Sequence, residues 1–330
     1  MYTLDPHTQQ MMDMIRQAGY PPLEALTPTQ ARKAYAASWE AMQSPGGEVA
    51  SVSDRTIEGP AGALTLRIYR GAGTAADAVL PCMVYLHGGG WVIGNLDSHD
   101  RLCRRLASLA GISVVALDYR LAPEHVFPAA VDDAACALRW VAAHTDALRI
   151  HPGALAVGGD SAGGNLAAVL ALMARDGDLP ALAYQALLYP VTDLMADSAS
   201  YARVTRDAPL TAATMAYFIG HYTPDAATRT DWRASPLRAA SVAGTAPALV
   251  LTVTHDPLCD EGQAYAARLS DAGVRVAALH LNDQTHGLLS QGRLVPAADV
   301  ITGYVASTIS HELHRAAAQA ATPVSTPTAT

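Results

Sequence analysis

The sequence predicts an α/β protein built on a mostly parallel β-sheet with helices covering both faces. Short apolar runs, rich in leucine and β-branched residues, alternate with helical patterns from residue 82 onward. These runs are continuously apolar, which is typical of strands buried on both faces. The chain has 330 residues, of which 50% are hydrophobic and 16% charged. That composition is sufficient for one large core.

The N-terminal part predicts helices followed by a β-hairpin. Residues 1–45 have helical spacing and run into the loop signal Ser44-Pro45-Gly46-Gly47. Residues 52–58 and 64–69 follow as two strand patterns, separated by a Gly/Pro turn at residues 59–62.

Strands and helices then alternate, with one interruption. Strands are predicted at residues 82–86, 113–117, 154–157, 186–189, 248–254 and 274–281. Helices are predicted at residues 101–110, 131–143, 166–175, 262–271 and 297–314. Residues 190–247 contain no strand pattern and are too long for a simple connection, so we expect an inserted element that forms a lid. An irregular surface loop is the alternative.

Composition also limits the classes of partner and location. The net charge is −8, with 22 basic and 30 acidic residues and no polybasic block, which argues against a nucleic-acid partner. Four widely spaced cysteines without a C-x-x-C pair argue against zinc and disulfides and favour the cytoplasm. We see no secretory signal, and the longest apolar helical run is far below the ~20 residues that span a bilayer. Residues 321–330 are predicted to be a flexible tail.

Ser161 is the candidate nucleophile. Residues 159–163 fit G-x-S-x-G and lie between a strand pattern and a helix pattern, the context of a nucleophile elbow. In such a turn a Cβ at Gly159 or Gly163 would collide with the chain, hence glycine. The alternatives are a glycine-rich packing turn and a phosphate-binding turn, although neither G-x-x-x-x-G-K-[ST] nor G-x-G-x-x-G is present.

A serine alcohol needs a base, and the base needs an orienting group. His286, one of twelve histidines, lies in the loop after the last predicted strand and is the candidate base. Asp256 follows the strand at 248–254 and is the candidate acid, because the proline after it favours a fixed, extended conformation. Asp193 is a rival acid, as are Asp260 and Glu261, which also fit the first turn of a helix.

The segment His87-Gly88-Gly89-Gly90 directly follows the strand at 82–86. Consecutive glycines leave N–H groups that can turn toward one point, and each donor aimed at a developing oxyanion is worth a factor of ~10²–10³ in rate. We assign this role to the N–H groups of Gly88 and Gly89, joined by that of Ala162 at a helix N-terminus. A flexible turn and a metal site at His87 are the alternatives; the missing acidic partners argue against metal.

With these segments in place, the chain resembles the bacterial hormone-sensitive-lipase-like esterases of the α/β-hydrolase fold, of the GDSAG type. The order Ser161, Asp256, His286 is that of α/β-hydrolases. The matching segments run in the family's order: YLHGGGWVIGNLDSHD, DYRLAPEHVFPAAVDD, GGDSAGGN, LLYPVTD, WRASPL, HDPLCDEG and HGLL. Two positions depart from the family pattern, Leu288 in place of phenylalanine and Thr254-His255 in place of an acidic and aromatic stretch, and both bear on substrate preference.

The resemblance implies an eight-stranded sheet with the hairpin as its antiparallel edge. It implies a catalytic domain at 51–192 and 241–320 and a helical cap from residues 1–50 and 193–240. It implies a triad of Ser161, Asp256 and His286, oxyanion donors at Gly88, Gly89 and Ala162, and structural supports at Glu124, His125 and Asp132.

The expected activity is that of a serine carboxylesterase acting on small, short- to medium-chain esters through an acyl-enzyme, without cofactor or metal. The alternatives are an arylacetamide-deacetylase-like amide hydrolase and a small-molecule receptor of the same fold; the presence of His286 and Asp256 disfavours the receptor. Tyr217 and Phe218 either line the acyl pocket or belong to the cap core. The resemblance also implies a homodimer that pairs through the last strand and helix.

Overall fold

The computed structural model describes residues 2–321 and contains the predicted eight-stranded sheet, in the order β1-β2-β4-β3-β5-β6-β7-β8. The strands are β1 (Val49–Gly59), β2 (Gly62–Gly71), β3 (Leu80–Leu86), β4 (Ser113–Asp118), β5 (Ile150–Asp160), β6 (Tyr184–Leu188), β7 (Ala248–His255) and β8 (Val276–Thr285). β2 runs antiparallel to both β1 and β4, and every other pair is parallel. The predicted fold class and the antiparallel hairpin edge are therefore confirmed.

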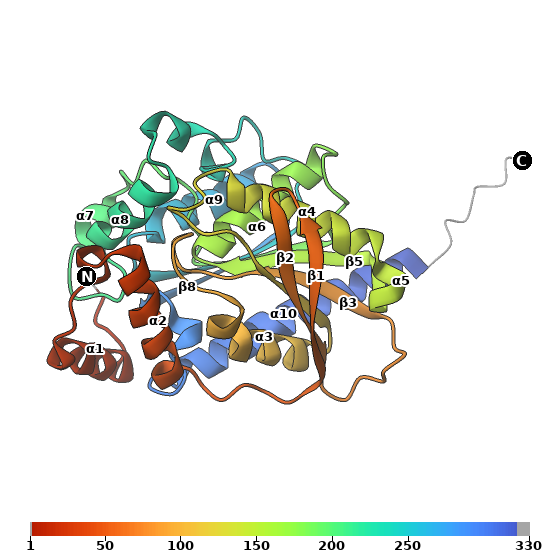
Figure 1. The fold of residues 1–330 in the computed structure, drawn as a ribbon, viewed down its shortest axis with the longest axis horizontal. Coiled ribbons are helices and arrows are strands. Elements are labelled where there is room, and N and C mark those ends of the chain that lie inside the picture. Colours follow the sequence, from red (N-terminus) through yellow and green to blue (C-terminus); the bar gives the residue numbers. More distant parts are fainter. Residues whose placement is uncertain (1, 322–330) are drawn as a thin grey trace, which may run out of the picture.

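Helices cover both faces of the sheet (Figure 1). α3 (Leu96–Ala110) and α10 (Ala297–Ala321) pack on one face, and α4 (Ala129–Ala143), α6 (Ala162–Arg175) and α9 (Cys259–Asp271) pack on the other. Along β3, Val84 enters the apolar cluster under α4 and α6, while Met83 enters the cluster under α3 and α10. Because both faces are buried, the strands read as continuous apolar runs.

The remaining helices come from two separate parts of the chain. Before the sheet lie α1 (Pro6–Ala18), η1 (Leu23–Ala25) and α2 (Pro28–Met42); between β6 and β7 lie α7 (Ala199–Arg203), α8 (Ala212–Tyr222), η2 (Ala226–Thr230) and η3 (Pro236–Arg238). The two short helices α5 (Thr145–Leu148) and η4 (Leu288–Ser290) follow α4 and β8. Residues 190–247 contain no strand, as predicted. The Thr214 hydroxyl donates to the Glu24 carboxylate at 2.8 Å, so the two parts are in contact.

Several elements are longer than the hydrophobic pattern predicts. α3 starts at Leu96, before the predicted position 101, because Asn95 and Ser98 form a capping box. The helix ends at Ala110, and Gly111 caps it in the left-handed conformation with a φ of 64°. Such polar caps lie outside the apolar periodicity from which helix bounds are predicted.

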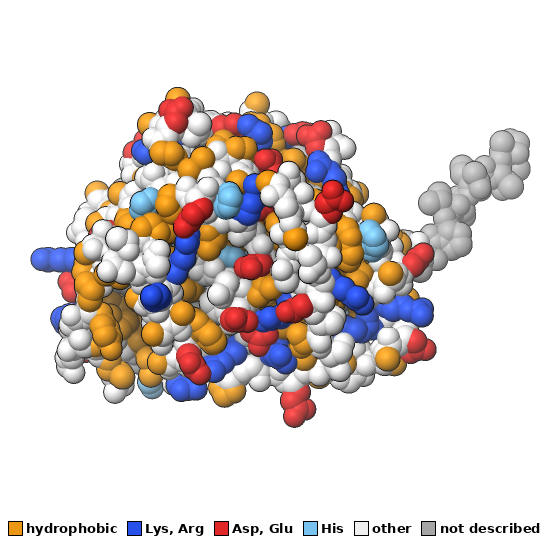
Figure 2. Space-filling model, viewed as in Figure 1, with side chains coloured by type: hydrophobic (Ala, Val, Ile, Leu, Met, Phe, Trp, Pro, Cys, Tyr) orange, Lys and Arg blue, Asp and Glu red, His pale blue; other side chains and the backbone are white. Residues whose placement is uncertain are grey.

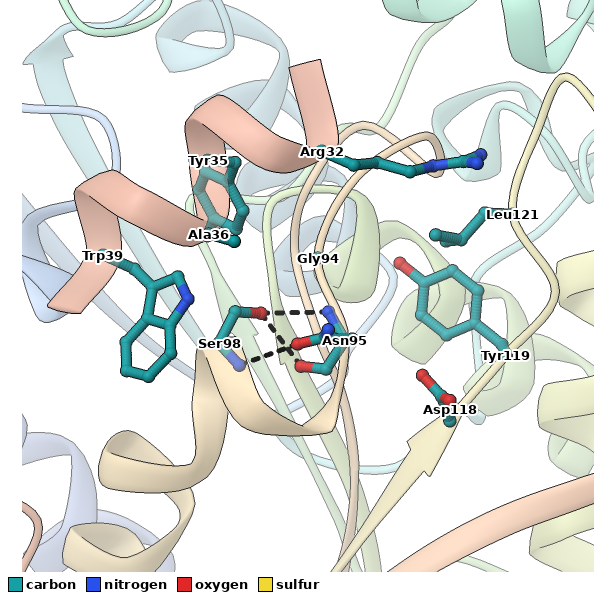
Figure 3. Close-up of a pocket in the computed structure, with 10 residues that line it drawn as sticks. All are labelled: Arg32, Tyr35, Ala36, Trp39, Gly94, Asn95, Ser98, Asp118, Tyr119 and Leu121. Carbon is teal, nitrogen blue, oxygen red and sulfur yellow. Dashed lines mark hydrogen bonds between the residues drawn. The ribbon is translucent and has the colours of Figure 1, made fainter. Parts of the chain in front are cut away.

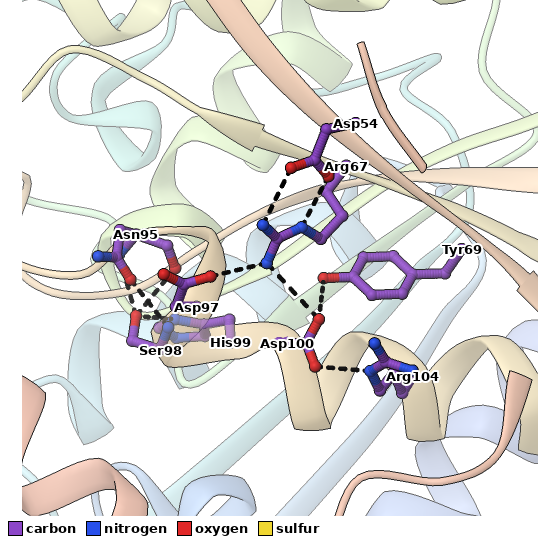
Figure 4. A network of polar contacts seen from close by, with 9 residues as sticks. All are labelled: Asp54, Arg67, Tyr69, Asn95, Asp97, Ser98, His99, Asp100 and Arg104. Atoms are coloured by element: carbon purple, nitrogen blue, oxygen red, sulfur yellow. Dashed lines mark hydrogen bonds and ion pairs between the residues drawn. The ribbon is translucent and has the colours of Figure 1, made fainter. Parts of the chain in front are cut away.

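Acidic and basic side chains are interspersed on the face of the molecule shown in Figure 2. Arg67 of β2 is an example, because it forms a bidentate pair with Asp54 and a further hydrogen bond to Asp97. Tyr69 and Arg104 extend this cluster through Asp100 (Figure 4).

Candidate active site

Ser161 lies in a strained turn between β5 and α6. Its φ is +57°, a value rare for a residue with a side chain, and it is only 7% exposed. The turn is close-packed, because a Cβ on Gly163 or Gly159 would lie 1.8 or 2.3 Å from the carbonyl oxygen of Leu86. Glycine at both positions lets the turn approach β3, as the sequence predicts.

The side chains of Ser161, His286 and Asp256 form a continuous hydrogen-bonded line. His286 Nε2 is 3.0 Å from Ser161 Oγ, and His286 Nδ1 is 2.7 Å from Asp256 Oδ2. Asp256 is fully buried, and its Oδ1 accepts the backbone N–H of Leu258 at 2.9 Å. The three residues follow β5, β7 and β8, whose carboxyl ends share one edge of the sheet.

The imidazole of His286 is held from several sides. The ring of Tyr189 packs edge-on against it, with 4.8 Å between the ring centroids. Gly287 adopts a φ of +76°, and the Gln291 side-chain amide donates to the His286 carbonyl oxygen at 2.9 Å. These contacts fix the direction of the ring before any ligand binds.

The three rival carboxyl groups are all engaged away from the imidazole. Asp193 forms a bidentate pair with Arg238 at 2.8 Å, and Asp260 pairs with Arg203 at 3.0 Å. Glu261 is buried and accepts two backbone N–H groups from the segment after β6, and burial raises its pKa well above the usual range. None of them takes the place of Asp256 beside the imidazole.

The glycine loop differs from the prediction at Gly88. Its N–H donates to Asp160 Oδ1 at 3.0 Å and is therefore not free to bind an oxyanion. Gly89 and Gly90 both have positive φ, and no hydrogen bond among residues 2–321 uses either N–H. The assignment of Gly88 is corrected: the free donors of the loop come one residue later.

Phe218 of α8 covers this loop. A Cβ on Gly90 would lie 2.2 Å from Cγ of Phe218, so the ring rests directly on the glycine. Phe218 is 4% exposed, whereas its neighbour Tyr217 is only partly buried. Phe218 thus belongs to the packed core and touches the glycine loop.

His87 is a structural residue of the loop. It is buried, its Nδ1 lies 2.8 Å from the Gly88 carbonyl oxygen, and its ring stacks on Tyr119 with centroids 4.2 Å apart. Burial lowers its pKa to about 3, so the ring is neutral at ordinary pH. Residues 2–321 contain no group of three or more His, Cys, Asp or Glu side chains that could hold a metal ion.

The expected structural supports are partly in place. Glu124 forms a bidentate pair with Arg32 of α2, and these hydrogen bonds hold the Glu124 pKa at about 2. His125 and Asp132 are exposed and support nothing in the core. The buried carboxylate is that of the next residue, Asp133, which receives the Arg120 guanidinium at 2.7 Å, so the prediction for Asp132 was wrong by one position.

A cavity of about 280 Å³ lies between α2 and the loop that begins α3 (Figure 3). Arg32, Tyr35 and Trp39 line it from α2, and Asn95 and Tyr119 line the other side. Ser161 is not among its lining residues. This cavity is therefore separate from the hydrogen-bonded line of Ser161, His286 and Asp256.

Residues 83–290 match the α/β-hydrolase fold family. The carboxylic ester hydrolase LipN of Mycobacterium tuberculosis is 42% identical over 322 residues, covering 95% of this chain and 84% of that protein. The ethyl acetate hydrolase of Pseudomonas putida is 39% identical, covering 88% of this chain and 92% of that protein.

Solved structures are similar over almost the whole chain. An α/β-hydrolase enzyme from the metagenome of Lake Arreo superposes with a TM-score of 0.91 at 39% identity, covering 94% of this chain and 99% of that one. A thermostable esterase from Pseudomonas putida superposes with a TM-score of 0.90 at 36% identity, covering 95% of this chain and 98% of that one.

No helix within residues 2–321 combines the length and apolarity needed to cross a bilayer.

Proposed function

We propose that this protein, which belongs to the hormone-sensitive-lipase-like esterases of the α/β-hydrolase fold, uses Ser161, His286 and Asp256 as a triad to hydrolyse small carboxylic esters with short to medium acyl chains. The observation that carries the proposal is the unbroken line of hydrogen bonds, 2.7 Å from Asp256 to His286 and 3.0 Å from His286 to Ser161.

The reaction starts at the Ser161 hydroxyl. His286 Nε2 takes its proton as the oxygen attacks the ester carbonyl, while Asp256 orients the imidazole and stabilises its charged form. His286 then gives the proton to the leaving alcohol, which departs and leaves an acyl-serine. A water molecule, deprotonated by the same imidazole, attacks the acyl group, releases the acid and restores the serine.

We assign the oxyanion to the N–H groups of Gly89, Gly90 and Ala162. Gly89 and Gly90 follow the anchored peptide of Gly88, and no hydrogen bond among residues 2–321 uses the N–H group of either glycine. Ala162 is the first residue of α6, whose N-terminal N–H groups have no partner within the helix. Such preorganised donors stabilise the tetrahedral intermediate.

The preference for short acyl chains rests on the helices above the site. We propose that residues 1–50 and 193–240 together form a cap over a catalytic domain made of residues 51–192 and 241–320. The hydrogen bond between Thr214 and Glu24 and the ion pair between Arg16 and Asp207 join the two parts. Phe218, from the second part, fills the space in front of Gly90 and limits the length of the acyl group.

An acyl-length series tests this function. The wild-type protein and Ser161→Ala are assayed with p-nitrophenyl esters from acetate to laurate, and their thermal unfolding is compared. We expect turnover that peaks at short acyl chains in the wild type and none in a Ser161→Ala variant that still unfolds cooperatively. Turnover by that variant contradicts the triad, and a maximum at laurate contradicts the proposed chain length.

We further propose a small-molecule ester as the only partner in the reaction and a homodimer formed at the edge of the sheet. β8 is the last strand of the sheet, and its Val276, Leu279 and Leu281 remain partly exposed. An unpaired, partly apolar edge can add a strand from a second copy. Light scattering tests the dimer.

The structure has four free thiols, those of Cys82, Cys103, Cys136 and Cys259. Free thiols support a cytoplasmic location.

A further inference from the structure

Asp160, which precedes Ser161, is a buried carboxylate in contact with the glycine loop. Its Oδ1 accepts the Gly88 N–H at 3.0 Å and the Tyr85 hydroxyl at 2.7 Å. Its Oδ2 lies 3.3 Å from His99 Nε2. The backbone of Asp160 is already paired with β6, so the strand does not need these side-chain contacts.

The contact between Asp160 and the loop is too close for any side chain at position 88. A Cβ on Gly88 would lie 2.3 Å from Asp160 Oδ2 and 2.9 Å from the Asp160 carbonyl oxygen. The loop is thus tied to the strand that carries Ser161, immediately before the two glycines with free N–H groups. A shift of this anchor would move both N–H groups relative to the Ser161 hydroxyl.

The carboxylate is itself held by a second set of contacts. His99 is buried in the first turn of α3, and its Nδ1 lies 2.9 Å from the Ser98 hydroxyl. Ser98 forms the capping box with Asn95, so the line of contacts ends on the start of a rigid helix (Figure 4). The position of Asp160 is therefore fixed through the first turn of α3 as well as through the glycine loop.

A negative charge beside the glycine loop would oppose an oxyanion unless it were neutralised locally. Three donors surround Asp160, from Gly88, Tyr85 and His99. Burial alone would raise the pKa of Asp160, but the charge and hydrogen bond of His99 together with the Tyr85 hydroxyl lower it to about 2. The group is ionised, and its charge is taken up by these three partners.

We propose that Asp160 is a positioning residue for the oxyanion site: its carboxylate anchors the Gly88 peptide, and this anchor aims the N–H groups of Gly89 and Gly90 at the reacting carbonyl. The inference rests on the proposed esterase mechanism. Asp160 does not touch the substrate, and its effect on the rate passes through the loop.

Two replacements of Asp160 separate hydrogen bonding from packing. Asp160→Ala removes the acceptor, whereas in Asp160→Asn the amide oxygen can still accept from Gly88 and Tyr85, with the NH₂ group turned toward His99. Because misplacing a catalytic donor by about 1 Å can cost about 10²-fold in rate, we expect Asp160→Ala to lower kcat for p-nitrophenyl butyrate by about that factor with little change in KM. Asp160→Asn should recover most of the loss.

The decisive readout is the affinity for a trifluoromethyl ketone, which adds to the serine and forms an oxyanion. The affinity should fall in Asp160→Ala by the same factor as kcat/KM and should recover in Asp160→Asn. Asp133→Asn is the matched control, since Asp133 is equally buried but is paired with Arg120. It should lower the melting temperature and leave the ketone affinity unchanged.

If Asp160→Ala does not fold, Asp160→Leu fills more of the vacated volume and replaces it in the same comparison. The inference is overturned if the apolar variant keeps kcat and ketone affinity, or if Asp160→Asn loses as much as the apolar variant. These results differ from a failure of the proposed function, in which the wild type itself would not hydrolyse the butyrate ester.

Discussion

Replacing Asp256 by asparagine tests the triad directly, because the shape of the side chain hardly changes while its hydrogen bonding does. Asp256 Oδ1 accepts the Leu258 N–H at 2.9 Å, so the amide oxygen of the variant is held there. The amide NH₂ group then faces His286 Nδ1, which lies 2.7 Å away and must become an acceptor. The imidazole consequently carries its proton on Nε2, opposite Ser161 Oγ, and cannot act as a base.

The expected fall in kcat follows from the free energy needed to turn the side-chain amide of the Asp256→Asn variant into the opposite orientation. Turning the amide over would restore the productive tautomer of His286 but would set the NH₂ group against the Leu258 N–H in a fully buried place. Each buried donor without a partner costs about 1–3 kcal/mol, so two of them cost about 2–6 kcal/mol. Since about 1.4 kcal/mol corresponds to tenfold in rate, kcat should fall by a factor between about 30 and about 10⁴.

The assay is kcat for p-nitrophenyl butyrate, with thermal unfolding measured in parallel. Asp193→Asn is the matched control, because Asp193 lies at the same edge of the sheet but is paired with Arg238. We expect its kcat to stay within about threefold of the wild type, the small effect usual for a change outside the site. An Asp256→Asn variant that keeps a tenth or more of wild-type kcat, or a large loss in the control, would refute the reasoning.

Four further predictions concern stability and specificity. Gly163→Ala should lower the free energy of unfolding in urea by more than the about 1–3 kcal/mol typical of overpacking, because the new Cβ meets a backbone oxygen at 1.8 Å. Arg120→Ala should cost about 3–5 kcal/mol in the same measurement by leaving the buried Asp133 carboxylate unpaired. The depressed pKa of Asp160, about 2 against an ordinary 3.8, contributes about 2 kcal/mol that is present above pH 4 and lost as the pH falls toward 2. Because Glu124 and other paired carboxylates titrate in the same range, urea unfolding should show a loss in both proteins that is about 2 kcal/mol larger in the wild type than in Asp160→Asn. Phe218→Ala should raise kcat/KM for octanoate relative to butyrate by about tenfold, as two or more methylene groups enter the space that the ring occupies; an unchanged ratio would place Phe218 in the core alone.

The sheet and the line of three side chains could be predicted because each depends on short stretches of sequence. Strands buried on both faces are continuously apolar. Residues that follow parallel strands lie at one edge of the sheet, independently of the segments that connect the strands. Ser161, Asp256 and His286 each come directly after such a strand. Predicting that these three side chains meet therefore required only the ends of the strands and their parallel arrangement.

The two wrong predictions, for Asp132 and Gly88, each depend on which one of several neighbouring residues makes a given contact. Asp132 and Asp133 are adjacent acidic residues at the start of α4, and only the helix phase determines that Asp133 is the one facing Arg120. The N–H of Gly88 is occupied by the side chain of Asp160 at the end of a different strand, which no property of the glycine run itself reveals. Both errors concern the contacts of single side chains rather than the elements themselves.

The contact between Gly88 and Asp160 becomes predictable once the strand order is known. β3 and β5 are parallel neighbours, and their register sets Leu86 beside Gly159. The residues that follow, His87 and Gly88 on one strand and Asp160 on the other, must leave the sheet side by side. A carboxylate at this place can reach a backbone N–H of the neighbouring loop without any movement of the strands, whereas an apolar residue would leave that N–H unpaired in a buried site. The residue between glycine and serine in G-x-S-x-G is thus constrained by the adjacent strand, and its chemistry should vary with the loop that this strand carries.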